Sequence, residues 1–283
     1  MKKYLKFLIS LIIIINTTNI IGKATIQVPN NNKASINEVD RLQKIKERGE
    51  LTVLSSNDEP YSYRDPKTGT FSGIDADIIR EVAKRLGIKE VRAKYIPFVN
   101  LFDELIKNNN IDLIVDGISI TDERKKLVDF TIPIYKDSGG LVIRTDLGIS
   151  SKEDLKSRTL GIIGGSVYLE EAEKLKKEGK IKNYIAFSDA NSLILGMKNR
   201  IIDAFLTDSI IGQDIIVKNP QLNFRILSPN EYPPNIVYNM GYPLRKNDTV
   251  LLNAINQKLQ EMKDDGTIYE ILIKYGLFGN YVD

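Results

Sequence analysis

Short apolar runs alternate with longer amphipathic runs along this chain, and the alternation occurs in two rounds. The first round consists of residues 51–56, 74–87, 91–96, 101–110 and 111–117. After a break, the second consists of residues 160–165, 167–179, 188–199, 202–208 and 224–228. Such alternation predicts parallel strands joined by crossover helices. We therefore expect an α/β protein with two units, each a mainly parallel sheet flanked by helices.

Two extended segments, punctuated by Gly and Pro, bracket the second round. They are KDSGGLVIR at 136–144 and SPNEYPPNIVYNMGYPL at 228–244. Such segments on both sides of one α/β unit indicate two crossings between lobes, and hence a two-strand hinge. The tail keeps Leu and Ile at helical spacing and is expected to return and cover the first lobe. We assign residues 44–137 and 239–283 to lobe 1, and residues 138–238 to lobe 2.

The N-terminus has the order of residues found in a secretory signal peptide. Three lysines precede an unbroken apolar run from Phe7 to Ile15, which is shorter than the roughly 20 residues that span a bilayer. A buried core segment is the alternative. We predict a signal peptide at 1–22, either cleaved or kept as an anchor, and a flexible, Asn-rich leader at 23–43. The chain would then be exported to the periplasm.

Composition excludes several classes of function. The chain has no Cys and no His, which excludes a thiol nucleophile, a His general base, thiolate or imidazole metal sites and disulfides. Neither a cofactor nor lipid attachment through a Cys is expected. Without the three lysines of the signal peptide, 37 basic side chains remain beside 37 acidic ones. A neutral chain of this kind offers no electrostatic footprint for nucleic acid.

The segment GISITDER at 117–124 directly follows the first round. Ligands of open α/β sheets collect beyond the carboxyl ends of strands, and Thr121 can cap a helix that begins there. Arg124 then lies in the first helical turn, where a cation meets the positive end of the helix dipole unless an anionic ligand reverses the penalty. The alternative is a local ion pair with Asp122 or Glu123.

Two further candidates belong to the second round. In GGSVY at 164–168, the backbone amides of Ser166 and Val167 at a helix start could seat a small anion, although a Gly-Gly pair is more often only a tight turn. Asp208 closes an apolar run. Its carboxylate could bind an ammonium group at the edge of a cleft, or cap the helix that follows.

Three aromatic residues, Tyr61, Tyr63 and Phe98, could pack on the non-polar parts of a ligand or belong to the core. An arginine with backbone amides suits a carboxylate, and an aspartate suits an ammonium group. Taken together, the candidates describe a site for an α-amino acid.

Five segments also match known motifs in order. FSGIDADIIREVAKRLG is similar to GFDVDLAxAIAKRLG, and IDLIVDGISITDERKKLVDFTIPIY to DxIxxGMTITxERxxxVDFSxPY. LGIIGGSVYLEE, IDAFLTD and LQEMKDDGTIYEILIKYG are similar to VGVxxGTTxEE, xDAxxxD and LxELKxDGTYxxIxxKYF. Through these motifs the chain resembles the extracellular solute-binding proteins of bacterial polar amino acid ABC uptake systems. The resemblance covers roughly residues 45–280 and implies the two-lobed, type II periplasmic-binding-protein fold.

The resemblance implies a role for each candidate. Arg124 would hold the carboxylate of the ligand and Asp208 its ammonium group, with Phe98 against its side chain. The groups that would assist at the carboxylate are Ser119, the backbone at Gly117, and the helix start at Ser166 and Val167.

The chain also departs from the motifs of the family. GSV stands where the family has GTT, so a second hydroxyl is missing at Val167. Before PYSY, Asp58 or Glu59 stands at the usual aromatic position. An acid there leads to the hypothesis that the bound amino acid has a cationic side chain, as in Lys or Arg.

The resemblance implies hinge closure without catalysis. The ligand would dock on the first lobe, the second would close over it, and a membrane-embedded ABC permease would recognise the closed monomer. One alternative is a dehydratase-like enzyme acting on a small carboxylic acid, with Asp58, Glu59 and Asp208 as acid and base. The other is a ligand-sensing receptor module, which we do not favour because the given chain ends at Asp283 with neither a membrane helix nor an output domain.

Overall fold

The computed structural model describes residues 40–234 and 237–282. The predicted signal peptide at 1–22 lies outside the described residues, as does most of the predicted leader. Helix α1 (Arg41–Arg48) begins within the leader range, because the Asp40 carboxylate accepts a hydrogen bond from the Gln43 amide at 2.9 Å and caps the helix. Within the described part of the chain, no helix combines the length and the apolar character needed to cross a membrane.

The first sheet has three parallel strands in the order β4-β1-β5. Strand β1 (Glu50–Ser55) is central and almost wholly buried, whereas β4 (Glu90–Tyr95) lies at an edge and alternates between exposed and half-buried residues. The third strand, β5 (Leu113–Ile114), is shorter than the predicted run at 111–117. Helix α2 (Ile74–Arg85) buries one apolar face against this sheet. We call this part of the chain, with the elements that pack on it, the first lobe.

The second sheet has the order β11-β7-β10-β8-β9, with β12 paired to β7. Strands β8 (Thr159–Ile163), β9 (Asn183–Phe187) and β10 (Ala204–Asp208) run parallel, while β11 (Phe224–Ile226) runs antiparallel to β7. The sequence pattern did not predict β9, because this strand is at an edge and only partly buried. We call the region around β8, β9, β10 and β11 the second lobe.

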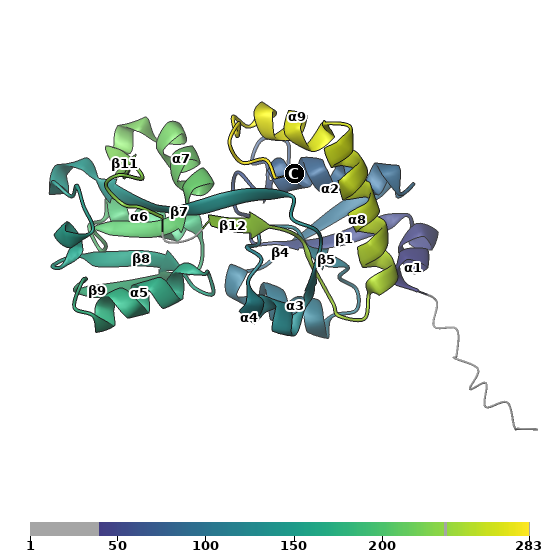
Figure 1. Cartoon of the computed structure of the whole chain (residues 1–283), viewed down its shortest axis with the longest axis horizontal. Coiled ribbons are helices and arrows are strands. Elements are labelled where there is room, and N and C mark those ends of the chain that lie inside the picture. The colour runs from purple at the N-terminus through teal and green to yellow at the C-terminus, as the bar shows by residue number, and fades with distance from the viewer. Residues whose placement is uncertain (1–39, 235–236, 283) are drawn as a thin grey trace, which may run out of the picture. The chain divides into compact units, whose positions relative to one another are not determined.

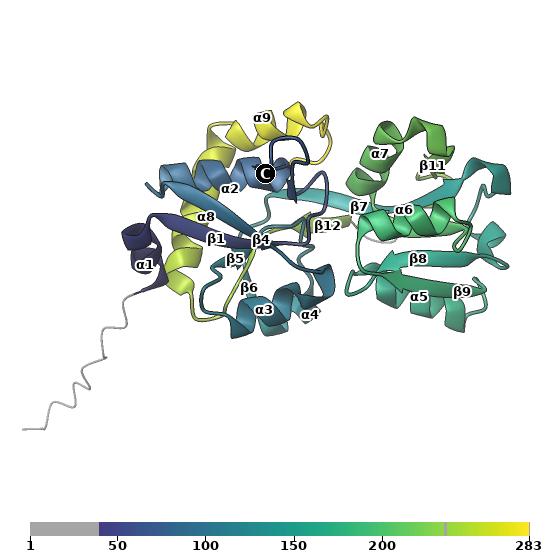
Figure 2. The ribbon, with the colours of Figure 1, turned by 180° about the vertical axis from the view of Figure 1, so that it is seen from behind.

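Two strands connect the lobes. Strand β7 (Tyr135–Arg144) pairs through its first residues with β12 (Val237–Met240) and through its later residues with β10 and β11. Figures 1 and 2 show β7 and β12 running side by side between the two groups of helices. The predicted two-strand connection is confirmed, and its first segment is one continuous strand rather than an irregular stretch.

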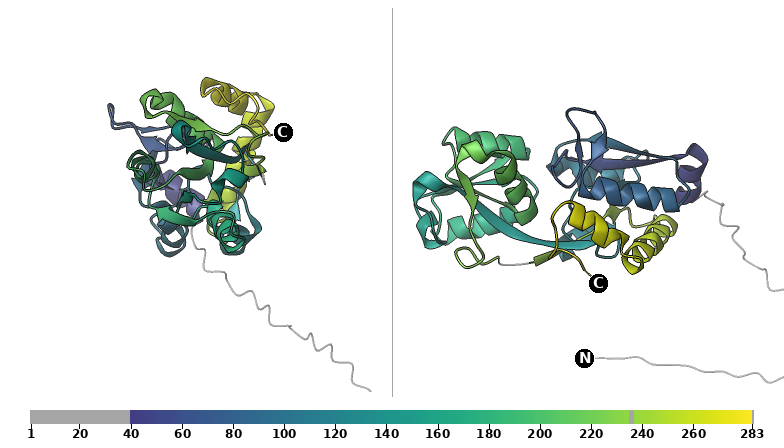
Figure 3. Two further views of the ribbon diagram at one scale, coloured as in Figure 1. Left: turned by 90° about the vertical axis from the view of Figure 1, so that its left-hand side faces the viewer. Right: turned by 90° about the horizontal axis from the view of Figure 1, so that it is seen from above.

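The C-terminal helices α8 (Thr249–Asp264) and α9 (Thr267–Lys274) return to the first lobe, as the sequence predicts. Their apolar residues share one core with α1 and α2, and Figure 3 shows α9 beside the first lobe. Leu251, Ile255, Leu259 and Met262 are fully buried at helical spacing.

The remaining elements connect these layers. The short strands are β2 (Tyr63–Arg64), β3 (Phe71–Ser72), β6 (Asp129–Phe130) and β13 (Pro243–Leu244). The remaining α-helices are α3 (Leu101–Lys107), α4 (Asp122–Leu127), α5 (Tyr168–Lys177), α6 (Ala190–Lys198) and α7 (Ser209–Lys218). Single 3₁₀ turns lie at Phe98–Asn100, Thr145–Leu147, Glu153–Leu155 and Pro220–Leu222.

Candidate functional site

Arg124 lies in the first turn of α4, on the side of the first lobe that meets the second. Thr121 caps this helix as predicted, since its hydroxyl accepts a hydrogen bond from the Arg124 amide at 3.2 Å. The Arg124 guanidinium donates to the carbonyl oxygen of Ser119 at 2.9 Å and to that of Gly165, in the second lobe, at 3.4 Å. Its central carbon lies 5.7 Å from the centroid of the Phe98 ring, so an aromatic face supports the cation.

The local ion pair considered for Arg124 is not formed. Asp122 and Glu123 pair instead with Lys125 and Lys126, at 3.4 and 2.6 Å. Across residues 40–234 and 237–282, no carboxylate forms an ion pair with the Arg124 guanidinium. Burial lowers the pKa of Arg124 to about 10, because removal from water disfavours its charged form. An anion at this position would therefore be favoured.

Asp208 ends β10 and precedes α7, but it does not cap that helix. The Asp208 carboxylate accepts a hydrogen bond from the Tyr168 hydroxyl at 2.7 Å. Asp137 on β7 takes the capping role instead, accepting from the Ile210 amide at 3.1 Å and from the Ser209 hydroxyl. The capping alternative for Asp208 is therefore wrong, and one of its carboxylate oxygens has no hydrogen-bond partner among the described residues.

The electrostatic surroundings of Asp208 favour a cation. Burial, followed by the negative charge of Asp137, raises the pKa of Asp208 well above its usual range, and Asp58 contributes in the same direction. The hydrogen bond from Tyr168 and the positive charge of Arg124 act in the opposite direction. A bound ammonium group would stabilise the ionised form of this carboxylate.

Gly117 is engaged within the protein. Its amide donates to the Asp75 carboxylate at 2.6 Å, and its φ of +59° with the Tyr61 ring against it explains why glycine stands there. Asp75 therefore occupies the Gly117 amide, and a contact of a ligand with the backbone at Gly117 stays a prediction. Ser119 is buried, and its carbonyl oxygen orients Arg124.

The turn after β8 differs in detail from the prediction. Helix α5 begins at Tyr168 with Val167 as the residue before it, and the Ser166 amide donates to the Ile163 carbonyl at 3.1 Å. The Ser166 amide therefore closes the turn and is not free for an anion. The Ser166 hydroxyl oxygen, in contrast, is buried and has no hydrogen-bond partner among the described residues.

Tyr61 belongs to the core in this structure, which was the alternative to its place in the site. Its side chain is fully buried, its hydroxyl donates to Asp137 at 2.7 Å, and its ring stacks on Tyr135. No surface of Tyr61 remains for a ligand. Tyr63 lies on β2, where the Lys218 ammonium group is 5.8 Å from its ring centroid.

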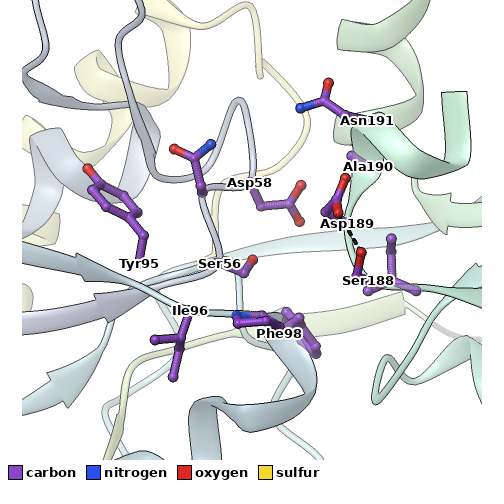
Figure 4. A pocket seen from close by; sticks show the side chains of 12 residues that line it. Ser56, Asp58, Tyr95, Ile96, Phe98, Ser188, Asp189, Ala190 and Asn191 are labelled. Atoms are coloured by element: carbon purple, nitrogen blue, oxygen red, sulfur yellow. Dashed lines mark hydrogen bonds between the residues drawn. The ribbon is translucent and has the colours of Figure 1, made fainter. Parts of the chain in front are cut away.

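A cavity of about 340 Å³ opens between the lobes (Figure 4). The first lobe lines it with Ser56, Asn57, Asp58, Tyr95, Ile96, Pro97 and Phe98, and the second lobe with Ile163, Ser188, Asp189, Ala190 and Asn191. Arg124 and Asp208 do not line this cavity, but Phe98 lies between it and Arg124.

The structure distinguishes the two acids that the sequence left open. Glu59 forms an ion pair with Lys218 of α7 at 2.6 Å, whereas Asp58 lines the cavity. Burial, and then the negative charge of Asp116, raises the pKa of Asp58 well above its usual range. Sequence reasoning missed Asp189, which follows the unpredicted strand β9 and caps α6 through the Ser192 amide at 2.8 Å.

The model of the bacterial extracellular solute-binding proteins, family 3, matches residues 51–279. The chain belongs to this family. The matched region contains all of both sheets except Glu50, together with the two connecting strands and every candidate residue described above. The family assignment and the two-lobed fold therefore confirm the resemblance that the motifs indicate.

Named relatives of this family agree with the assignment. The chain is 28% identical over 222 residues to the probable histidine-binding protein of Campylobacter jejuni, covering 77% of this chain and 80% of that protein. A mutant of ArgBP from T. maritima has a similar fold, with a TM-score of 0.74, 31% identity, and coverage of 83% of this chain and 98% of that chain. An ancestral amino acid-binding protein, a precursor of cyclohexadienyl dehydratase, gives a TM-score of 0.70 at 27% identity, with coverage of 83% and 98%.

Proposed function

We propose that this chain binds a free amino acid between its two lobes and delivers it to an ABC permease. The observation that carries the proposal is Arg124, a half-buried cation that faces the second lobe and has no carboxylate partner among the described residues. An isolated buried charge is costly unless a ligand compensates it.

Asp208 would bind the second charged group of the ligand. An α-amino acid carries a carboxylate and an ammonium group on one carbon atom, so its site needs opposite charges a short distance apart. Arg124 supplies the first and Asp208 the second, and the electrostatic influence of each on the pKa of the other supports their proximity. Ser119, Ser166 and Val167 are proposed to assist at the carboxylate, Ser166 through its unpartnered hydroxyl.

The two groups belong to different lobes, which gives the binding event a mechanical consequence. Arg124 is on the first lobe and Asp208 on the second, and β7 and β12 are the connections between them. A ligand that contacts both groups binds the closed arrangement better than an open one and shifts the population toward it. The permease would then distinguish the closed form from the open form.

Relatives are named as extracellular or periplasmic binding proteins, and the N-terminal run fits a secretory signal. We place the mature chain in the periplasm as a monomer. Because the chain has no Cys, attachment through a lipidated Cys is not part of this proposal.

The site is proposed to bind its ligand and not to transform it. The alternative is a dehydratase-like enzyme in which Asp208 and Asp58 serve as acid and base. Incubation with small carboxylic acids, including 2-hydroxy and cyclohexadienyl acids, should give no product. If the protein converts any of these acids to a product, the proposal that it only binds its ligand is wrong.

The first test is a thermal-shift screen of the exported chain against the twenty amino acids, ornithine and citrulline, with calorimetry on each hit. A ligand at 100 times its dissociation constant stabilises the folded state by about 2.7 kcal/mol, which is a readily measured shift. Arg124→Ala should lower the affinity for the hit by about 2–5 kcal/mol, since the ligand carboxylate loses its charged partner.

Arg92→Ala is the matched control, because Arg92 is an exposed arginine on the outer strand β4. That variant should bind like the unaltered protein. If Arg124→Ala binds as tightly as Arg92→Ala, the proposed carboxylate site is wrong.

A further inference from the structure

Two carboxylates from opposite lobes share the cavity of about 340 Å³. Asp58 lies in the loop after β1, and Asp189 precedes α6. Figure 4 shows their carboxyl groups facing each other across the space between the lobes. The two side chains are therefore placed to contact one group from two sides.

Asp189 is held in position as an anion. Its carboxylate accepts hydrogen bonds from the Ser192 amide at 2.8 Å and from the Ser188 hydroxyl at 2.6 Å. Burial raises the pKa of Asp189, but these hydrogen bonds outweigh burial and lower it overall. A fixed negative charge thus lies on the second-lobe wall of the cavity.

Asp58 is the unusual member of the pair. Its carboxylate has no hydrogen bond and no ion pair among the described residues, although the residue is half-buried and lines the cavity. The neighbouring acids are satisfied, since Asp116 accepts from Ser56 at 2.6 Å and Asp214 pairs with Lys218 at 2.9 Å. Asp58 alone in this group has an open partner position, and it points into the cavity.

The walls of the cavity restrict what can occupy that position. Neither Lys nor Arg occurs among its lining residues, and the nearby Lys218 is engaged by Glu59 and Asp214. The part of the chain that the structure describes contains no group of three or more acidic residues placed to hold a metal ion. Phe98 and Ile163 offer apolar surface along the cavity, which suits the methylene stem of an organic cation.

This cavity adjoins the proposed amino acid site. Phe98 lines the cavity and also lies under the Arg124 guanidinium. Asp58 is close enough to Asp208 to influence its ionisation. A ligand whose α-carboxylate rests on Arg124 and whose ammonium group rests on Asp208 would direct its side chain past Phe98 toward Asp58 and Asp189.

We infer that Asp58 and Asp189 together bind the positively charged end of the ligand side chain, so that the amino acid taken up is a basic one. The inference rests on the proposed function, because it assigns the side-chain end of the same ligand. It adds Asp189 as a specificity-determining residue and gives the second lobe a role in choosing the side chain as well as in closing over it.

The test compares arginine with citrulline, which has nearly the same shape and no side-chain charge. Calorimetry on the full exported chain should give at least a tenfold tighter dissociation constant for L-arginine than for L-citrulline. Asp58→Asn and Asp189→Asn should each weaken arginine binding tenfold or more and change citrulline binding less than threefold. Asn retains the cap of α6 at position 189, so this variant should fold.

Asp103→Asn is the matched control, since it removes an equal charge from the exposed pair with Lys107. That variant should bind arginine as tightly as the unaltered protein. Equal affinity for citrulline and arginine, or equal losses for both ligands in the two cavity variants, would overturn the inference while leaving the amino acid site intact. If no amino acid of any charge binds, the proposed function itself fails, and the assignment of the cavity fails with it.

Discussion

The hinge contains a buried carboxylate and the ligand cleft contains half-buried charged side chains, and the partners of these groups differ. At the hinge, the Asp137 carboxylate on β7 accepts hydrogen bonds from Tyr61 in the first lobe and from Ser209 and Ile210 in the second. In the cleft, Arg124 has no carboxylate partner and Asp58 has no partner among the described residues. Asp137 thus has partners from both lobes, whereas neither of these two cleft side chains has a partner of opposite charge among the described residues.

This difference distinguishes polar side chains that stabilise the fold from polar side chains that bind the ligand. A buried polar group with all its partners holds a fold in one arrangement, whereas one without a partner costs free energy until a ligand arrives. Asp137 joins the crossing strand to both lobes, so its contacts should stabilise the folded state. Arg124, Asp58 and Ser166 should instead contribute little to stability and much to binding.

The strongest test of this comparison is Asp137→Ala. The substitution leaves the Tyr61 hydroxyl and the Ile210 amide buried without an acceptor, and each such group costs about 1–3 kcal/mol. The unfolding free energy should fall by about 4 kcal/mol in urea titrations. Asp122→Ala, at an exposed carboxylate of α4, should change it by less than about 0.5 kcal/mol. Equal stabilities of the two variants would contradict the structural role of Asp137.

The sequence predicts the helices and strands better than it predicts which side chains contact each other. The runs at 51–56 and 74–87 predicted β1 and α2 within a few residues, because burial on one or both faces imposes the hydrophobic pattern. The contact between Tyr61 and Asp137 spans 76 positions, and no local pattern indicates it. Tyr61 was accordingly a candidate for the site, although it lies in the core.

The sequence also leaves open which of the two acids before PYSY faces the ligand. Asp58 and Glu59 are neighbours of the same charge, so spacing alone could not decide which faces the ligand. The ion pair of Glu59 with Lys218 on the other lobe decides it. Asp189 was missed because β9 is a half-buried edge strand without a clear alternation, and its capping role is the sequence signal that could have drawn attention to it.

Ligand binding should depend on pH through Asp208. Burial and the charge of Asp137 raise the pKa of Asp208 in the free protein, while a bound ammonium group favours the ionised form and so lowers it. Below the pKa of the free protein, binding must therefore expel a proton. Acidification from pH 8 to pH 5 should weaken the affinity by up to tenfold for each pH unit below that pKa.

Calorimetry in two buffers of different ionisation enthalpy measures this proton release. Asp208→Asn is the control, and its weaker binding should depend less on pH. The neighbours Asp58, Asp137 and Arg124 remain in that variant. If its binding depends on pH as strongly as that of the unaltered protein, one of these neighbours, and not Asp208, releases the proton.

A smaller effect is expected for the ligand-free protein when Asp58 is replaced by Asn. The raised pKa means that the folded protein holds the Asp58 proton more tightly than the unfolded chain does. The stability that this proton contributes is present at low pH and is lost as pH rises through the folded-state pKa. At pH 8 the variant should be more stable than the unaltered protein, and acidification should stabilise it less than the unaltered protein, as followed by melting curves.

The smallest effect on the unfolding free energy is expected when Ser166 is replaced. Its hydroxyl is buried and without a partner, whereas the buried Ser62 hydroxyl donates to the Val115 carbonyl at 2.6 Å. Removing a hydroxyl that makes no hydrogen bond relieves a desolvation penalty, and removing one that does leaves its acceptor unpaired. Ser166→Ala should therefore leave the unfolding free energy unchanged or raise it by about 0.5 kcal/mol, while Ser62→Ala should lower it by about 1 kcal/mol.

If the Ser166 hydroxyl donates to the ligand carboxylate, Ser166→Ala should also weaken amino acid binding by about 1 kcal/mol, measured by calorimetry. If Ser166→Ala lowers the unfolding free energy and leaves the affinity unchanged, Ser166 stabilises the fold and does not bind the ligand.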